Sequence, residues 1–166
     1  MTRTDQFEIA IAGMGNLLMR DDGVGIHAVR ALENNVPPGV RVLDVGTAIL
    51  HALPLLEDAR RVLVIDAVRA GGAPGSVYFL DASDVELRSR ASSVHSWGLL
   101  EALKLMGRGP IPEIRVLGVE PAELGYGMEL SSAVEAALND VVGMVHRIVV
   151  GWRMETTRRN LSEKVA

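Results

Sequence analysis

Short apolar runs and longer stretches of helical periodicity alternate along most of the chain. Apolar residues dominate four runs that predict β-strands, at 9–12, 40–45, 62–65 and 114–119. The third run has no polar position, which is typical of a strand in the middle of a parallel sheet covered on both faces. The pattern therefore predicts a buried sheet.

Between and after these runs, apolar residues recur at the spacing of amphipathic helices. The pattern predicts helices at 24–32, 50–56, 96–106 and from Ser132 to Trp152. Pro54 is expected in the first turn of the second helix or at a break in it. Because the apolar stripe ends after Trp152, we expect a domain at 1–152 followed by a polar, flexible tail at 153–166.

Strands and helices alternate in chain order, which predicts an α/β fold. We expect a three-layer αβα single domain with a mainly parallel sheet. The run 76–80 follows a glycine-rich break at 71–75 and is the candidate for one antiparallel strand at the sheet edge. The polar, serine-rich segment 81–94 lacks either period and is expected to be a loop.

Composition narrows the class of protein. The 166 residues include no cysteine, which excludes disulfides, thiolate metal sites and a cysteine nucleophile. The net charge of −4 and the absence of a basic cluster give no reason to expect nucleic acid. The polar start lacks the features of a signal peptide, and no apolar run approaches the ~20 residues of a membrane span. We expect a cytoplasmic protein that binds no membrane, with a monomer favoured.

The stretch 13–25 is the first candidate site, because a strand, a glycine turn, two adjacent acids and a helix start follow one another there. Asp21 and Asp22 fall before the helix, where capping the helix is the common role of an aspartate. Gly13 and Gly15 also permit a dinucleotide-binding loop. That match is incomplete, since Leu18 occupies the place of the third glycine and two acids would repel a pyrophosphate.

Several chemically active side chains are predicted to meet at one edge of the sheet. Ligands of such folds bind at the carboxyl ends of the strands. Two carboxylates and an imidazole there could hold a divalent transition metal and leave positions open for water or substrate. The candidates are four acids that follow strand ends and one histidine before a helix: Asp22, Asp44, Asp66, Glu120 and His95.

Short motifs spread over residues 9–148 resemble, in their order and spacing, those of the hydrogenase maturation endopeptidases. These proteases trim a C-terminal extension from the large subunit of nickel-iron hydrogenases. The sequence departs from the family at Val45, where many members carry glycine. The motifs are Gly-Met-Gly-Asn at 13–16, Asp-Asp-Gly-Val-Gly at 21–25, Asp-Val-Gly-Thr at 44–47, Ile-Asp-Ala at 65–67, His-Ser-Trp-Gly-Leu at 95–99 and Val-Glu-Pro at 119–121.

The resemblance implies an aspartyl-type endopeptidase whose partner is the precursor of a hydrogenase large subunit. It places the catalytic and metal-contacting roles on Asp22, Asp66 and His95. The metal it implies is nickel, carried by the precursor and recognised as a signal that the precursor is ready to be cut. The metal would then polarise the scissile carbonyl, or would position the substrate while Asp22 or Asp66 acts as base.

Two other function classes stay open. A noncatalytic nickel-binding assembly factor would use the same three ligands, and a dinucleotide-binding oxidoreductase would use Gly13 and Gly15. Standard protease motifs are absent, since the chain has neither the H-E-x-x-H of zinc proteases nor the G-x-S-x-G of serine hydrolases. The remaining histidines, His27, His51 and His146, lie in predicted helices without a matching partner.

Overall fold

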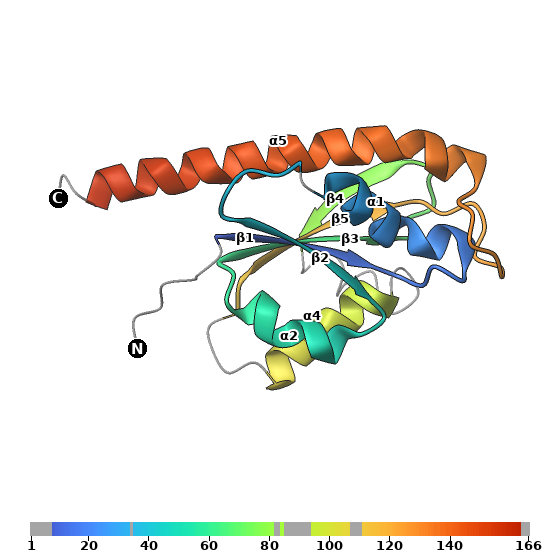
Figure 1. Cartoon of the computed structure of the whole chain (residues 1–166), viewed down its shortest axis with the longest axis horizontal. Helices are drawn as coiled ribbons and strands as arrows, with labels where there is room; N and C mark the ends of the chain where they lie inside the picture. Colours follow the sequence, from blue (N-terminus) through green and yellow to red (C-terminus); the bar gives the residue numbers. More distant parts are fainter. Residues whose placement is uncertain (1–7, 34, 82–83, 85–93, 107–110, 164–166) are drawn as a thin grey trace.

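The computed structural model describes residues 8–33, 35–81, 84, 94–106 and 111–163 and centres on a five-stranded sheet (Figure 1). The strand order is β2-β1-β3-β5-β4. Neighbouring strands are parallel except for β4, which pairs antiparallel with β5 at the edge. The mainly parallel sheet with one antiparallel edge strand is thus confirmed. The strands are β1 Ile9–Met14, β2 Val40–Gly46, β3 Arg61–Ala67, β4 Val77–Asp81 and β5 Glu113–Val119.

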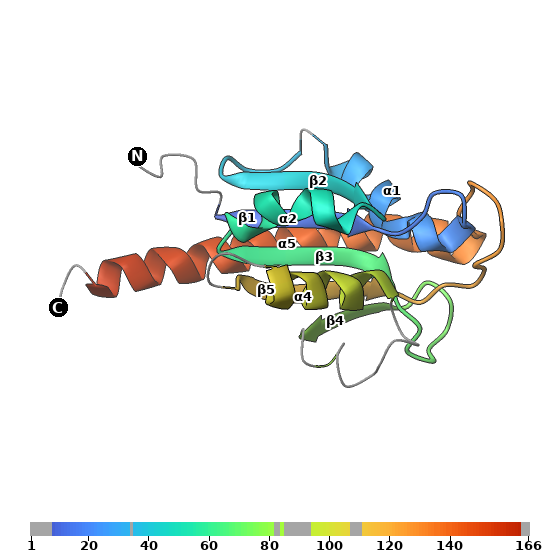
Figure 2. The same ribbon diagram turned by 90° about the horizontal axis from the view of Figure 1, so that it is seen from below.

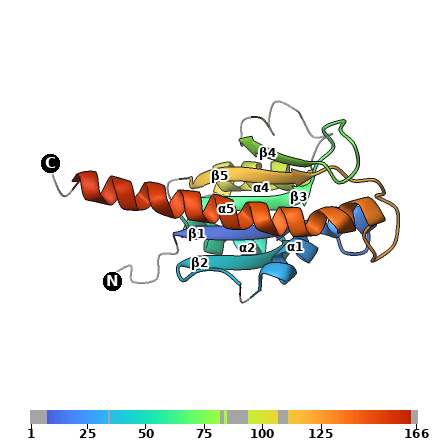
Figure 3. The ribbon, with the colours of Figure 1, turned by 90° about the horizontal axis from the view of Figure 1, so that it is seen from above.

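Helices cover both faces of the sheet and complete the predicted αβα single domain. Figure 2 shows α2 and α4 across one face, and Figure 3 shows α1 and α5 across the other. A short 3-10 helix, η1, precedes α1. The helices are η1 Arg20–Gly23, α1 Val24–Leu32, α2 Ile49–Glu57, α4 Val94–Met106 and α5 Ser132–Glu163.

Alternating side chains of the central strands feed two separate hydrophobic cores. Ile9 and Ile11 of β1 pack in the core that includes residues of α1 and α5. Ala10 and Ala12, which point the other way, pack in the core that includes residues of α2 and α4. Because side chains alternate between the faces of a strand, a run that is apolar at every position fills both cores.

The last helix runs further than the periodicity predicted. We expected it to end at Trp152, but α5 continues to Glu163, so that prediction is wrong. Residues 153–163 contain neither glycine nor proline, and they include several strong helix formers. Buried Arg61 also holds the extension, since its guanidinium donates to the Trp152 carbonyl at 2.9 Å and to Glu155 Oε2 at 2.8 Å.

Smaller differences concern the position of Pro54 in α2 and the start of α4. Pro54 lies inside α2, not in its first turn. The helix α4 begins at Val94, so His95 belongs to its first turn instead of preceding it. The predicted loop 81–94 falls largely outside the described residues. Within the described residues, every helix is too short or too polar to cross a membrane.

Candidate functional site

Glycines let the loop after β1 fold tightly against the start of α1. Gly15 has a φ of +120°, and a Cβ there would overlap the carbonyl oxygen of Asp22. A Cβ on Gly25 would overlap the carbonyl oxygen of Ile65 in β3. Gly15 and Gly25 thus allow the backbone of the loop after β1 and of the start of α1 to pack directly against neighbouring backbone. Neither η1 nor α1 has a side-chain cap, so Asp21 and Asp22 do not play the capping role considered from the sequence.

Asp22 and His95 meet at the carboxyl edge of the sheet. His95 Nε2 lies 3.1 Å from Asp22 Oδ2, which also accepts a hydrogen bond from the backbone N–H of Asn16 at 2.8 Å. Each of the two side chains is 21% exposed, so solvent or a substrate can reach them. The sequence places these residues 73 positions apart, and the fold joins them directly.

The charge of this site favours a protonated imidazole. The hydrogen bond that Asp22 accepts from the imidazole raises the pKa of His95 above its ordinary value of 6.5. Burial opposes the rise, and the negative charges of Asp66 and Asp22 add to it.

Asp66 is fully buried at the end of β3 and is bound to the residue that follows His95. Ser96 donates to Asp66 Oδ2 from its backbone N–H at 3.0 Å and from its Oγ at 2.7 Å. The backbone N–H of Ala67 donates to Asp66 Oδ1 at 2.9 Å. Ser96 therefore fixes the carboxylate of β3 to the first turn of α4. Sequence reasoning missed this role, for which a hydroxyl beside the candidate histidine was the available signal.

The predicted three-ligand site is assembled in part. Asp22 and His95 contact each other, and Asp66 joins them through Ser96. Ligand atoms about 2.1 Å from one ion and at right angles lie about 3 Å apart, which fits the oxygen and nitrogen of Asp22 and His95. Within the described part of the chain, no three His, Asp or Glu side chains are grouped closely enough to hold a metal ion. The assignment of the three residues as catalytic and metal-contacting stays a prediction.

Asp21 has a role quite different from that of its neighbour. Its carboxylate is fully buried and accepts four hydrogen bonds, from the backbone N–H groups of Ala122, Glu123 and Ser131 and from Ser131 Oγ, at 2.7 to 2.8 Å. Burial alone would raise the pKa of Asp21, but these hydrogen bonds outweigh it and lower the pKa below the usual value. Asp21 thus fastens the loop after β5 to the loop before Asp22.

The two loops also pair through their backbones. Arg20 N–H donates to the Gly127 carbonyl at 2.8 Å, and Gly127 N–H donates to the Leu18 carbonyl at 3.0 Å. The loops lie side by side at the right-hand end of Figures 1 and 3. They form a fixed rim beside Asp22.

The other two acids at strand ends do not contact the Asp22–His95 pair. Asp44 lies at the surface, where its Oδ2 is 3.3 Å from Arg30 Nη2. Glu120 is buried and accepts hydrogen bonds from Tyr78 Oη at 2.9 Å and the backbone N–H of Ala70 at 2.8 Å. Burial opposes ionisation of Glu120, yet these donors lower its pKa. Glu120 therefore organises the loop after β3, and Asp44 forms an exposed ion pair.

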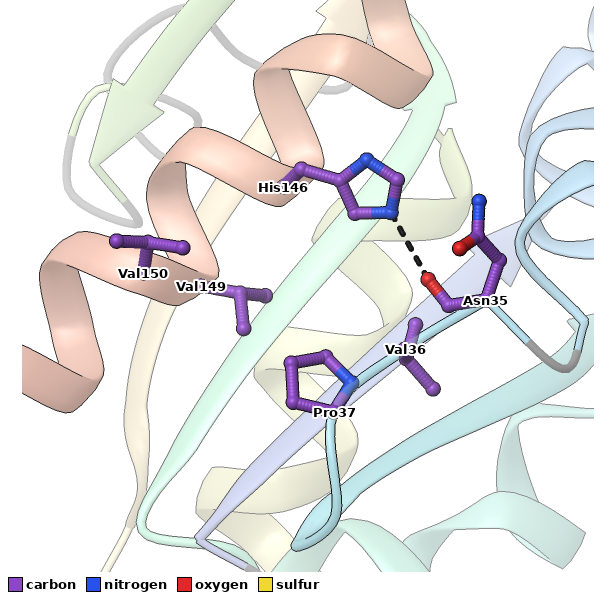
Figure 4. A pocket seen from close by; sticks show the side chains of 6 residues that line it. All are labelled: Asn35, Val36, Pro37, His146, Val149 and Val150. Carbon is purple, nitrogen blue, oxygen red and sulfur yellow. Dashed lines mark hydrogen bonds between the residues drawn. The ribbon is translucent and has the colours of Figure 1, made fainter.

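A pocket of about 400 Å³ lies beside His146, away from this edge (Figure 4). Asn35, Val36 and Pro37 line it from the segment before β2, together with residues of α5. His146 Nε2 lies 2.9 Å from the Asn35 carbonyl oxygen. The segment leads into the amino end of β2, so His146 lies at the opposite edge of the sheet from His95.

Comparison with known proteins decides the family. The family model described as HycI, hydrogenase maturation protease, matches residues 26–148. The chain belongs to the hydrogenase maturation protease family. This protease is 32% identical to the hydrogenase expression/formation protein HupD of Rhodobacter capsulatus over 158 residues, which span 90% of the chain and 75% of HupD.

Solved structures agree with this assignment. The hydrogenase maturating endopeptidase HybD from E. coli has a TM-score of 0.74 and 30% identity, over 83% of this chain and 89% of HybD. The [NiFe] hydrogenase maturation protease HybD from Thermococcus kodakarensis has a TM-score of 0.73 and 31% identity, over 85% and 98%. This maturation protease is thus a peptidase, as the sequence predicted. The matched family is one of proteases, a class different from the dinucleotide-binding oxidoreductases considered from the sequence.

Proposed function

We propose that this maturation protease removes the C-terminal extension from the large-subunit precursor of a nickel-iron hydrogenase after nickel has been inserted. In this proposal Asp22, Asp66 and His95 recognise nickel that the precursor carries. The observation that carries it is the contact of Asp22 Oδ2 with His95 Nε2 at 3.1 Å, at the open edge of the sheet.

The chemistry of the donor set supports recognition of a metal that comes with the substrate. Carboxylate oxygens and an imidazole nitrogen suit a borderline divalent ion such as nickel. The described residues offer only the Asp22–His95 pair in direct contact, with Asp66 held close by through Ser96. A site that is incomplete by itself suits an ion whose remaining ligands belong to the precursor.

Asp22 is the better candidate for the general base. Asp66 is fully buried with hydrogen bonds to both carboxylate oxygens, whereas Asp22 is 21% exposed and uses Oδ2 for its described contacts. Asp22 would take a proton from water as the water oxygen attacks the scissile carbonyl carbon. The C–N bond then breaks as the proton passes to the leaving amine. Nickel held by the precursor would polarise that carbonyl.

Mass spectrometry of the products tests the proposal. The protease is mixed with nickel-loaded and with nickel-free precursor, and we expect loss of the C-terminal peptide only from the loaded form. Binding of the loaded precursor without loss of the peptide would instead indicate the noncatalytic assembly factor. Chelator added after nickel has entered the precursor should inhibit less than removal of nickel before mixing.

The variant His95→Ala tests the site itself. Because His95 is in the first turn of α4 and outside both cores, we expect the variant to fold while processing of loaded precursor falls at least tenfold. The matched control His146→Ala removes an imidazole at the opposite edge and should keep the parent rate. Circular dichroism confirms folding of both. Processing by folded His95→Ala at the parent rate would overturn the nickel-recognition role.

A further inference from the structure

An apolar hollow lies between α2 and α4, separate from the contacts of Asp22 and His95. Its volume is about 460 Å³. Residues 47–51, at the end of β2 and the start of α2, line one side, and Gly98 and Ala102 of α4 line the other. The lining has no Asp, Glu, Lys or Arg. Leu50 in this lining is 60% exposed.

Gly98 keeps one wall of the hollow open. Apart from its chain neighbours and the backbone of its own helix, a Cβ at this position would meet only Ile49 Cδ1 within 4 Å, at 3.2 Å. The backbone φ of Gly98 is not in the left-handed region, so the helix itself does not require glycine here. A larger side chain at position 98 would therefore extend into the hollow.

The hollow opens one helical turn from the candidate site. Gly98 follows His95 by three residues within α4, and residues three apart are neighbours on one side of a helix, about 4.5 Å apart along its axis. An extended peptide advances about 3.4 Å per residue. A side chain that enters the hollow therefore belongs to a residue within about two positions of a peptide bond held at Asp22 and His95.

We propose that this hollow is a specificity subsite that receives one aliphatic side chain of the precursor, within about two residues of the bond that is cut. The proposal rests on the proposed function. Ile49, Leu50 and Ala102 offer apolar surface to such a side chain. A charged side chain finds no Asp, Glu, Lys or Arg in the lining to pair with, so it gains less contact energy there than an aliphatic side chain.

Filling the hollow and then shrinking the substrate tests this subsite. Gly98→Leu should lower kcat/KM on the nickel-loaded parent precursor about tenfold or more, mainly through KM, because it occupies the space of the substrate side chain. Precursor variants carry alanine in turn at each of the two positions on either side of the cut. One of them should recover most of the lost rate with Gly98→Leu. The control Gly151→Leu adds the same side chain to open space on α5 and should behave as the parent.

A charge introduced into the lining of the hollow gives a second test, which does not depend on filling the hollow. Leu50 is exposed in the first turn of α2, where an acid is compatible with the helix, so Leu50→Asp should fold. This variant should process the parent precursor more slowly and should prefer the precursor with lysine at the position that alanine identified. A thermal unfolding curve checks that each variant is folded.

The outcomes separate the two proposals. If the parent protease leaves nickel-loaded precursor intact, the proposed function fails. If the parent cuts it, but Gly98→Leu and Leu50→Asp cut every precursor variant at parental rates or lose activity equally on all of them, the subsite alone is wrong. If Gly98→Leu does not fold, Leu50→Asp is tested on precursors that carry lysine in turn at each of the two positions on either side of the cut, and a preference for none of them would overturn the subsite.

Discussion

At the scale of single residues, two adjacent aspartates show how one local pattern serves two purposes. Asp21 turns inward to four donors on the loop after β5, while Asp22 turns toward His95. Both acids occur in the same short 3-10 helix. From the local sequence, both aspartates are expected to have the same role. Only their contacts with distant segments show that the roles differ.

Asp21→Asn should destabilise the protein by ~2–3 kcal/mol, because an amide in place of a buried carboxylate sets an N–H group against donors. Urea unfolding measures the change. Asp44→Asn is the control, since its exposed ion pair with Arg30 should contribute less than ~1 kcal/mol. A loss for Asp21→Asn no larger than that for Asp44→Asn would contradict the fastening role.

The same carboxylate predicts how stability depends on pH. The pKa of Asp21 is lower in the folded than in the unfolded state, so its contribution is present above the unfolded pKa of ~3.9 and is lost as pH falls through the folded pKa. The difference in unfolding free energy between the parent and Asp21→Asn should be constant above about pH 5 and shrink below about pH 4.

His95 should titrate above its ordinary pKa, because Asp22 and Asp66 favour the imidazolium. Proton NMR of the imidazole should give a midpoint above 6.5 in the parent and a lower one in Asp22→Asn. This interaction stabilises the fold below the unfolded pKa, and the stabilisation is lost as pH rises through the folded pKa. Processing that needs a neutral imidazole should therefore fall on the acid side of that midpoint. A parental midpoint below 6.5 would show that Asp22 and Asp66 do not act on His95 as described.

At the scale of elements, α5 is one helix with two environments. Up to Trp152 its apolar side chains pack on the sheet. Beyond Trp152 most side chains with described burial are exposed, and Arg61 connects the two parts through Trp152 and Glu155. The guanidinium carbon of Arg61 also lies 5.4 Å from the centre of the Trp152 ring, and a cation at this distance is attracted to the aromatic face.

Two truncations should separate the held part of α5 from the rest. A chain ended after Glu155 should keep the unfolding free energy to within ~0.5 kcal/mol, because the removed residues are largely exposed. A chain ended after Trp152 with an amidated C-terminus should lose about 1 kcal/mol, because Arg61 then lacks the Glu155 carboxylate and no terminal carboxylate replaces it. Denaturant unfolding compares the two, and equal stability would mean that Glu155 adds nothing.

At the scale of the whole molecule, the apolar pattern predicted the layers and the edge strand of the sheet. A strand that is covered on both faces has apolar residues at every position, and this pattern can be read from the sequence. The entirely apolar run 62–65 was predicted to lie in the middle of the sheet, where β3 is found. The run 76–80 was predicted at the edge of the sheet and is confirmed as β4. The end of α5 was not predictable in the same way, since it depends on Arg61, which lies in another element. Likewise, the hydrogen bond of Ser96 to Asp66 joins residues 30 positions apart, so the hydroxyl beside His95 does not reveal by itself which carboxylate it contacts.

The hydrogen bonds of Asp21 with Ser131 also join two segments that the ribosome makes at different times. The two residues are 110 positions apart, and the strands β2 to β5 all lie between them in the sequence. Contacts with such long sequence separation form late and slowly. On a ribosome, a nascent chain that has not yet exposed Ser131 cannot fix the rim beside Asp22. The full set of hydrogen bonds that holds this rim together therefore forms only after residue 131 has been made.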